Sequence, residues 1–243
     1  MRNIVSHGVA YRKGFLRMDR RLQALADFVQ EGSVAADIGT DHGYLALALV
    51  QQGRAERVIA SDKNRGPYEA ACRSIQEAGL EQSVEVRLGD GLQVLQPGEA
   101  DTICIAGMGG QLICEILSAS PEVLLEARQL ILQPMNAAKE LRGWLYGHGW
   151  NIEDESLAEA DGRLYEIISA VKGQAALPSP VLLSIGPRLW EKKPQLLKRH
   201  VAELTAKLEK AVQGMEKSRA ATASAKYRSL KQQIKELEGY MKW

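Results

Sequence analysis

Five short apolar runs, separated by stretches of helical periodicity, restrict the fold of this 243-residue sequence more than any other feature. The runs are rich in Val, Ile and Leu, and each leads into Gly, Asp or Pro. Strands buried on both faces of a parallel sheet have such continuous apolar runs, whereas half-exposed strands alternate. The order therefore predicts a doubly wound α/β sheet. The runs are VAADI (34–38), RVIAS (57–61), VEVRL (84–88), DTICIA (101–106) and RQLILQ (128–133).

Two further apolar runs, over 150–156 and 163–171, have no helical stretch between them and predict an antiparallel pair at one edge of the sheet. The three cysteines form no CxxC pair, so we expect neither a disulfide framework nor a zinc site, and no metal. No signal peptide or membrane-spanning stretch is expected either. These features predict a cytoplasmic protein.

The composition changes beyond residue 172. The stretch 175–194 carries four of the eight prolines and predicts a linker over residues 173–190. Over residues 191–243, apolar residues then recur in alternating steps of four and three, which is typical of a coiled coil. A break at 216–226 favours two helices in an antiparallel hairpin, and a single long helix that dimerises is the alternative. The apolar positions are Leu197, Val201, Leu204, Leu208, Ala211 and Met215, then Tyr227, Leu230, Ile234, Leu237 and Met241.

The charge is distributed unevenly along the chain. Residues 1–21 carry a net +5, residues 22–186 a net −12, and residues 187–243 a net +8. Basic ends on an acidic body indicate an anionic partner, although a solvated lysine-rich surface has the same composition. The segment before Met18 is either a basic arm or lies upstream of the native start.

The first predicted strand leads into DIGTDHGYL (37–45), a glycine turn that departs from the dinucleotide-binding pattern. That pattern, GxGxxG, leaves bare backbone so that pyrophosphate can rest at a helix N-terminus. Here the glycines are Gly39 and Gly43, and Asp41 stands near the expected phosphate position. A carboxylate repels phosphate but attracts a cation. The loop therefore favours the cationic S-adenosyl-L-methionine over NAD, with an NAD-dependent oxidoreductase as an alternative.

Acidic and glycine residues also follow the next three predicted strands. Asp62 comes about 20 residues after the glycine turn, the spacing of a residue that binds ribose hydroxyls. Asp90, in LGDGL, is expected to bind the exocyclic amine of adenine, and the glycines of IAGMGG (105–110) would let backbone approach a flat ring. Each feature alone is equally consistent with a helix cap or a turn. At the ends of successive parallel strands, they together predict a cofactor crevice.

Five segments of the chain together resemble the TrmK family of bacterial tRNA (adenine(22)-N1)-methyltransferases. The resemblance covers about residues 18–172, and a basic helical C-terminal domain is also typical of that family. It implies a class I (Rossmann-like) S-adenosylmethionine-dependent methyltransferase domain with a C-terminal helical coiled-coil hairpin. It also implies that N1 of an unpaired adenine in the D-loop region of tRNA, at position 22, is methylated. The segments are DIGTDHGYLALAL, GDGL, IAGMGG, LILQPMN with the following LRGWL, and EADGRLYEII.

The resemblance also implies a set of cofactor-binding residues. The resemblance places Asp37, Gly39, Asp41 and His42 at the methionine and sulfonium end of the cofactor. Arg21 would meet its carboxylate, Asp62 would bind the ribose, and Asp90 and Gly91 would face the adenine. Residues 106–108 would close the pocket. The set is Arg21, Asp37, Gly39, Asp41, His42, Asp62, Asp90, Gly91, Ala106, Gly107 and Met108.

Two residues are candidates for a part in the reaction itself. Asp41 is placed to stabilise the positive charge that develops on the methylated adenine. Asn136 is the amide that would hold the acceptor base, although the family pattern LQPN is here LQPMN, which moves the amide by one position. The tRNA is expected to contact the basic C-terminal helices and the N-terminal segment. A non-catalytic RNA-binding protein is the remaining alternative.

Overall fold

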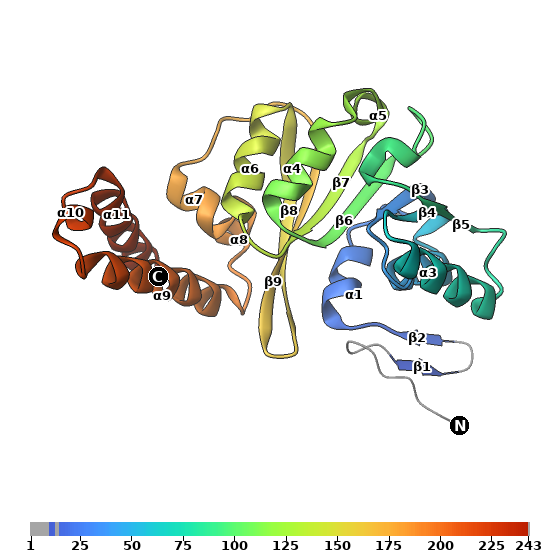
Figure 1. Ribbon diagram of the computed structural model, residues 1–243, viewed down its shortest axis with the longest axis horizontal. Coiled ribbons are helices and arrows are strands. Elements are labelled where there is room, and N and C mark those ends of the chain that lie inside the picture. Colours follow the sequence, from blue (N-terminus) through green and yellow to red (C-terminus); the bar gives the residue numbers. More distant parts are fainter. Residues whose placement is uncertain (1–9, 13–14, 243) are drawn as a thin grey trace. The chain divides into compact units, whose positions relative to one another are not determined.

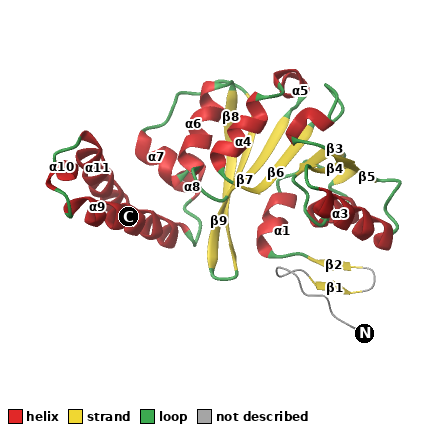
Figure 2. Cartoon of the chain, viewed as in Figure 1, coloured by secondary structure: helices red, strands yellow, loops and turns green. Residues whose placement is uncertain are grey.

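The computed structural model of the protein describes residues 10–12 and 15–242 and divides into two compact units, Met1–Ala176 and Leu177–Trp243 (Figure 1). In the described part of the first unit, a seven-stranded sheet has the order β5-β4-β3-β6-β7-β9-β8 (Figure 2). Its strands are β3 (Ser33–Ile38), β4 (Ala55–Asp62), β5 (Val84–Leu88), β6 (Thr102–Met108), β7 (Gln129–Pro134), β8 (Trp150–Ala160) and β9 (Arg163–Lys172).

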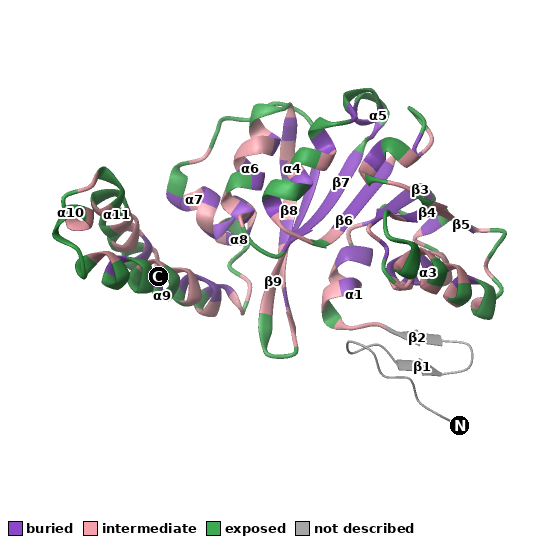
Figure 3. Ribbon diagram, viewed as in Figure 1, coloured by how far each residue is buried: buried purple, intermediate pink, exposed green. Residues whose placement is uncertain are grey.

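The sheet confirms the predicted doubly wound α/β architecture with an antiparallel pair at one edge. Strands β3 to β7 are parallel, whereas β9 is antiparallel to both β7 and β8. The runs in the middle of the sheet are buried, as their uninterrupted apolar character requires, and Figure 3 shows β3, β6 and β7 largely in the buried class. This arrangement is the Rossmann-like fold of class I methyltransferases, as expected.

Helices cover both faces of the sheet. The cluster that contains Leu25, Leu47 and Ile75 packs α1 to α3 on one face, and the cluster that contains Ile113 and Leu141 packs α4 to α6 on the other. The elements are α1 (Arg20–Ala26), α2 (Tyr44–Gln51), α3 (Arg65–Ala78), the 3-10 helix η1 (Gly91–Val94), α4 (Gly110–Ser118), α5 (Pro121–Glu126) and α6 (Ala138–Gly147). The β8–β9 pair is tied to α6 by Arg142, which is buried and donates to Glu155 (2.7 Å) and Glu166 (2.6 Å).

The predicted boundary between residues 21 and 22 is wrong, because it falls inside α1. Asp19 caps this helix by accepting a hydrogen bond from the Leu22 amide (2.7 Å), so the helix begins before the boundary. Ahead of α1, β1 (Ala10–Arg12) and β2 (Phe15–Arg17) pair as an antiparallel hairpin. The rest of the predicted basic segment, residues 1–9 and 13–14, lies outside the described residues.

The second unit is helical, and the predicted linker over 173–190 is wrong for most of its length. Pro180 and Pro187 begin two short helices, because proline is favoured in the first turn, where its missing N–H is not needed. The elements are α7 (Pro180–Ile185), α8 (Pro187–Lys192), α9 (Leu197–Glu216), α10 (Arg219–Thr222) and α11 (Ala225–Tyr240).

Helices α9 and α11 form the expected antiparallel hairpin. The ring of Tyr240, at the end of α11, meets Trp190 near the start of α9, with centroids 4.5 Å apart. The predicted apolar stripe drifts, however: Ala211 is exposed and Val212 is buried. The cause is the helical period of about 3.6 residues, which rotates a strict 3.5-residue pattern away from the contact. In the described part of the chain, no helix is both long and apolar enough to cross a membrane.

Candidate functional site

A cavity of about 280 Å³ opens at the carboxyl edge of the sheet, where β3, β4 and β6 end. Strand β3 lies between β4 and β6, so the chain crosses to opposite sides of it at this edge. Ligands of open α/β sheets bind at such a switch point. The cavity is lined by Asp19, Arg21, Leu22, Asp37, Gly39, Thr40, Asp41, His42, Tyr44, Leu45, Asp62, Ala106, Gly107 and Met108. Most of the residues that we predicted to bind a cofactor therefore line one cavity, and Asp90 and Gly91 do not. Asn136, the candidate for holding the acceptor base, does not line it either.

The turn after β3 is shaped by left-handed backbone. Every second residue from 39 to 43 has a positive φ: Gly39 (+77°), Asp41 (+49°) and Gly43 (+73°). The amides of Gly39 and Thr40 both donate to the Ser61 carbonyl of β4, each at 2.8 Å. A side chain on Gly39 would overlap the terminal methyl group of Met108. A Cβ atom at Gly39 would therefore require the Met108 side chain to move, and the turn leads the chain directly into α2.

Asp37, the last acid before the turn, is buried beneath it. Its Oδ2 accepts a hydrogen bond from the Thr40 hydroxyl at 2.6 Å. Burial raises the pKa of Asp37 to about 6, although the Thr40 hydrogen bond and the positive charge of Arg21 oppose the shift. Burial disfavours the ionised form of this carboxyl group, and a cation that binds beside it would stabilise that form. This residue is therefore suited to a positively charged ligand group.

Asp41 and His42 form the solvent side of the cavity. The Asp41 side chain is 68% exposed, and its Oδ1 lies 3.7 Å from Nε2 of His42. The His42 ring stacks on Tyr44 with centroids 5.2 Å apart. Asp41 is one of the non-glycine residues with left-handed backbone, a conformation that Asp tolerates better than most residues and that often marks functional sites.

Asp62, at the end of β4, lines the same cavity. Its Oδ1 accepts a hydrogen bond from the Asn64 amide (2.8 Å), which fixes the orientation of the carboxylate. Asp37 and Asp62 come from neighbouring parallel strands, so the two carboxylates share one edge of the sheet.

Asp90 and Gly91 are not among the residues that line this cavity. Asp90 lines a separate open hollow with Arg87, Leu88, Gly89 and residues of η1, and its carboxylate lies 4.0 Å from Nζ of Lys63. The chain turns into η1 directly after Asp90. A Cβ atom on Gly91 would lie 3.1 Å from the Ile116 side chain, so this glycine allows contact with α4.

Gln133 is a residue that we did not predict, and it connects the two sides of the site. Its side chain is fully buried at the end of β7, and its Oε1 accepts hydrogen bonds from Arg21 Nη1 (3.0 Å) and from the Gly107 amide (3.1 Å). Gly107 forms a bulge in β6, which points its amide at Gln133. The Arg21 guanidinium also lies 5.6 Å from the Tyr165 ring centroid. A polar residue at the end of the apolar run RQLILQ was the available signal. Asp19, Thr40 and Tyr44 also line the cavity without having been predicted.

Asn136 lies against the glycines of the β6–α4 turn. Its carbonyl accepts from the Gly110 amide (3.0 Å), and its Oδ1 would lie 3.1 Å from a Cβ atom on Gly109. A Cβ atom on Gly110 would lie 2.5 Å from the Ala137 carbonyl oxygen. The expectation that all glycines of IAGMGG face a ligand is therefore corrected: Gly107 lines the cavity, and Gly109 and Gly110 permit packing against residues 136–137.

Within the described part of the chain, no cluster of His, Cys, Asp and Glu side chains is arranged to hold a metal ion. The residues that line the cavity instead offer carboxylates, a guanidinium and backbone amides. This set suits an organic ligand that carries both charges.

Comparisons with known proteins agree with this geometry. A family model described as a methyltransferase domain matches residues 18–168. The tRNA (adenine(22)-N(1))-methyltransferase of Bacillus subtilis is 41% identical over 195 residues, which are 78% of this chain and 82% of that protein. The chain belongs to this methyltransferase family.

Solved structures of this family have the same fold. The Streptococcus pneumoniae protein Sp1610, in complex with S-adenosyl-L-methionine, is 32% identical with a TM-score of 0.83, and the match covers 93% of this chain and 100% of that chain. TrmK from M. capricolum, in complex with S-adenosyl-homocysteine, is 25% identical with a TM-score of 0.79, and the match covers 93% and 98% of the two chains. The match to these two structures therefore extends over nearly the full length of this chain.

Proposed function

We propose that this protein transfers the methyl group of S-adenosyl-L-methionine to N1 of adenine 22 in tRNA. The observation that carries the proposal is that Asp37, Asp62 and Arg21 come together in the cavity at the end of β3. The B. subtilis relative is named for this activity, and two family members were solved with the donor or its product. Because the proposed substrate is tRNA, we expect the enzyme to act in the cytoplasm.

The residues of the cavity fit the donor better than they fit a dinucleotide. When bound, S-adenosyl-L-methionine supplies a methyl group on a positively charged sulfur. Asp37 and Asp41 provide negative charge for the sulfonium and amino groups, whereas they would repel a pyrophosphate. Arg21 pairs with the methionine carboxylate, and Asp62 accepts hydrogen bonds from the ribose hydroxyls. Gly39, His42, Ala106, Gly107 and Met108 form the walls around these groups.

The transfer itself asks little of the protein's side chains beyond positioning. N1 of adenine has a lone pair at neutral pH, so it attacks the methyl carbon without first losing a proton. The product carries the positive charge that the sulfonium gives up, and no general base is required. Positioning therefore supplies most of the rate enhancement, and Asp41 stabilises the charge that appears on the base. Asn136, packed against Gly109, holds the turn beside which the base enters.

The adenine must leave its stack to reach the cavity, because N1 lies on the Watson–Crick edge. The acidic first unit cannot attract RNA over most of its surface, so the helical unit provides the phosphate contacts, together with the basic N-terminal segment. On α11, Arg228, Lys231 and Lys235 line an open groove with Tyr227. This basic stripe, with one aromatic ring, is the surface that we assign to the tRNA backbone.

Incubation of total tRNA with labelled S-adenosyl-L-methionine, followed by nucleoside analysis, tests the proposal. We expect N1-methyladenosine at position 22, and no label with Asp37→Asn, which keeps the size of the side chain but removes its charge. N6-methyladenosine or an unlabelled tRNA would contradict the proposal. Calorimetric titration with S-adenosyl-homocysteine and with NAD distinguishes a methyltransferase from an NAD-dependent oxidoreductase. We expect S-adenosyl-homocysteine to bind and NAD not to bind.

Donor affinity should weaken in acid because Asp37 becomes protonated. The pKa of Asp37 is raised to about 6, so the carboxylate that attracts the cation is ionised above this pH and neutral below it. Between pH 7 and 6 we expect a small change in the dissociation constant of S-adenosyl-L-methionine, and below pH 6 a loss approaching about tenfold per unit. Calorimetry across pH 5 to 7 measures the profile. Asp37→Asn should bind weakly with no such slope, and an equal slope in both proteins would assign the effect to another group.

A further inference from the structure

The turn that carries Asp90 is anchored in the core by Leu92 and Leu95, but Asp90 itself is exposed. It runs from the end of β5 through η1 toward β6, and the Asp90 side chain is 65% exposed. Asp90 stands at the start of η1 without capping it, and its carboxylate lies 4.0 Å from Lys63. A side chain that is held so loosely depends on the shape of the turn for its position.

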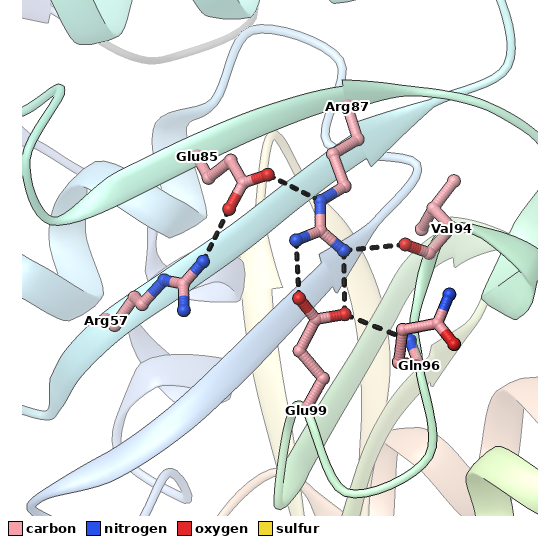
Figure 4. A network of polar contacts seen from close by, with 6 residues as sticks. All are labelled: Arg57, Glu85, Arg87, Val94, Gln96 and Glu99. Atoms are coloured by element: carbon pink, nitrogen blue, oxygen red, sulfur yellow. Dashed lines mark hydrogen bonds and ion pairs between the residues drawn. The ribbon is translucent and has the colours of Figure 1, made fainter.

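Arg87, at the base of this turn, contacts the opposite limb of the turn at several points (Figure 4). Its Nη1 donates to the Val94 carbonyl at 2.7 Å and to Glu99 Oε2 at 2.8 Å, and its Nη2 donates to the other carboxylate oxygen of Glu99. Glu99 Oε2 also accepts from the Gln96 amide at 2.9 Å. Charged hydrogen bonds of this forked kind are stronger and more directional than neutral ones. Together they join the two ends of the turn.

Two further observations show that the turn is closed tightly here. A Cβ atom on Gly89 would lie 2.5 Å from Cγ1 of Val94, so the two limbs are in contact next to Asp90. Arg87 stabilises the ionised form of Glu99, because the paired guanidinium lowers the pKa of Glu99 to about 2. The pair therefore stays charged at any physiological pH.

We propose that Arg87 and Glu99 are positioning residues for the adenosine half of the methyl donor. They close the turn over residues 87–99 and so hold the Asp90 carboxylate at the position where it meets the exocyclic amine of adenine. The inference rests on the proposed function. Arg87 and Glu99 are 22% and 20% exposed at the edge of the sheet, and among the described residues they bond, beyond Glu85, only to residues of this turn. The effect of their pairing is local, on the geometry of the turn.

The test measures binding of S-adenosyl-homocysteine and of 5′-methylthioadenosine, which has the adenosine but lacks the amino-acid end. For Arg87→Gln and Glu99→Gln we expect both affinities to fall by the same factor, about tenfold. In tRNA methylation the KM for the donor should rise while kcat at saturating donor stays unchanged. Arg87→Lys, which keeps the charge but loses the fork, should recover part of the loss.

Arg57→Gln is the matched control, because Arg57 pairs with Glu85 at the outer end of the same network and does not contact the turn (Figure 4). It should bind both ligands as the wild type does. Wild-type affinities in Arg87→Gln and Glu99→Gln would overturn the inference alone, as would a lowered melting temperature in both variants that accounts for their weaker binding. A wild-type protein that binds neither ligand would overturn the proposed function as well.

Discussion

Removal of residues 177–243 is expected to reduce tRNA methylation by at least about 1000-fold, while the affinity for S-adenosyl-homocysteine stays within about twofold of that of the full chain. Residues 177–243 carry a net charge of +8, whereas residues 22–176 carry −12. Loss of several phosphate contacts costs RNA binding orders of magnitude, because each contact releases counterions. The truncated protein keeps every strand of the seven-stranded sheet and every residue that lines the cavity. Filter binding measures the affinity for tRNA, calorimetry the affinity for S-adenosyl-homocysteine, and methylation assays the rate of transfer.

The truncation is placed after Ala176 because α7 and α8 belong to the second unit. If they were kept and the rest of the second unit were removed, their buried residues Val181, Ile185 and Leu189 would be exposed. Circular dichroism and a cooperative melting transition establish that the truncated protein is folded. Normal turnover of tRNA by the folded truncated protein would contradict the assignment of the RNA surface. Loss of S-adenosyl-homocysteine binding would instead show that the second unit supports the cavity.

A triple substitution on α11 tests the positive charge of this helix while the second unit is kept. Replacement of Arg228, Lys231 and Lys235 by Ala should lower the slope of log affinity against log salt by about 3, since each phosphate contact contributes about 0.9. Arg199→Ala is the control, because the Arg199 guanidinium is paired with Glu203 at 2.8 Å and should contribute less to the slope. Equal slopes for the triple variant and the wild type would place the tRNA elsewhere.

The sheet and the cavity were predictable because their signals are local. Apolar runs such as RVIAS and RQLILQ specify buried strands, and the residue that follows each strand in a parallel sheet lies at the carboxyl edge. Asp37, Gly39 and Asp62 could therefore be assigned to one crevice from their order along the chain.

The residues that the sequence did not reveal depend on contacts between distant segments. Gln133 joins Arg21 to Gly107 across two elements, and nothing near residue 133 specifies those partners. Gly109 and Gly110 resembled ligand-binding glycines, but the close approach of residues 136–137 explains them. Prolines at 180 and 187 were interpreted as linker residues because a proline that starts a helix and one that interrupts a chain look alike in sequence.

Substitution of Gly39 by Ala is the point change that we expect to have the largest effect on donor binding, a loss of at least about 100-fold, equivalent to about 2.7 kcal/mol. Two costs arise. Left-handed backbone disfavours a side chain by about 1 to 2 kcal/mol, which lowers the free energy of unfolding. The new methyl group would also overlap the end of the Met108 side chain, which is flexible and lines the cavity, so Met108 moves into the space that the donor needs.

Gly53→Ala separates these two costs. Gly53 also has left-handed backbone (φ +68°), but no atom lies within 4 Å of its Cβ position, so the substitution imposes the strain without the overlap. The two variants should lose similar unfolding free energy in urea titrations, and Gly39→Ala alone should lose affinity for S-adenosyl-L-methionine. Adding Met108→Ala to Gly39→Ala should restore part of that affinity, because the shorter side chain leaves the cavity open. Equal affinities in Gly39→Ala and Gly53→Ala would show that Met108 does not control access to the cavity.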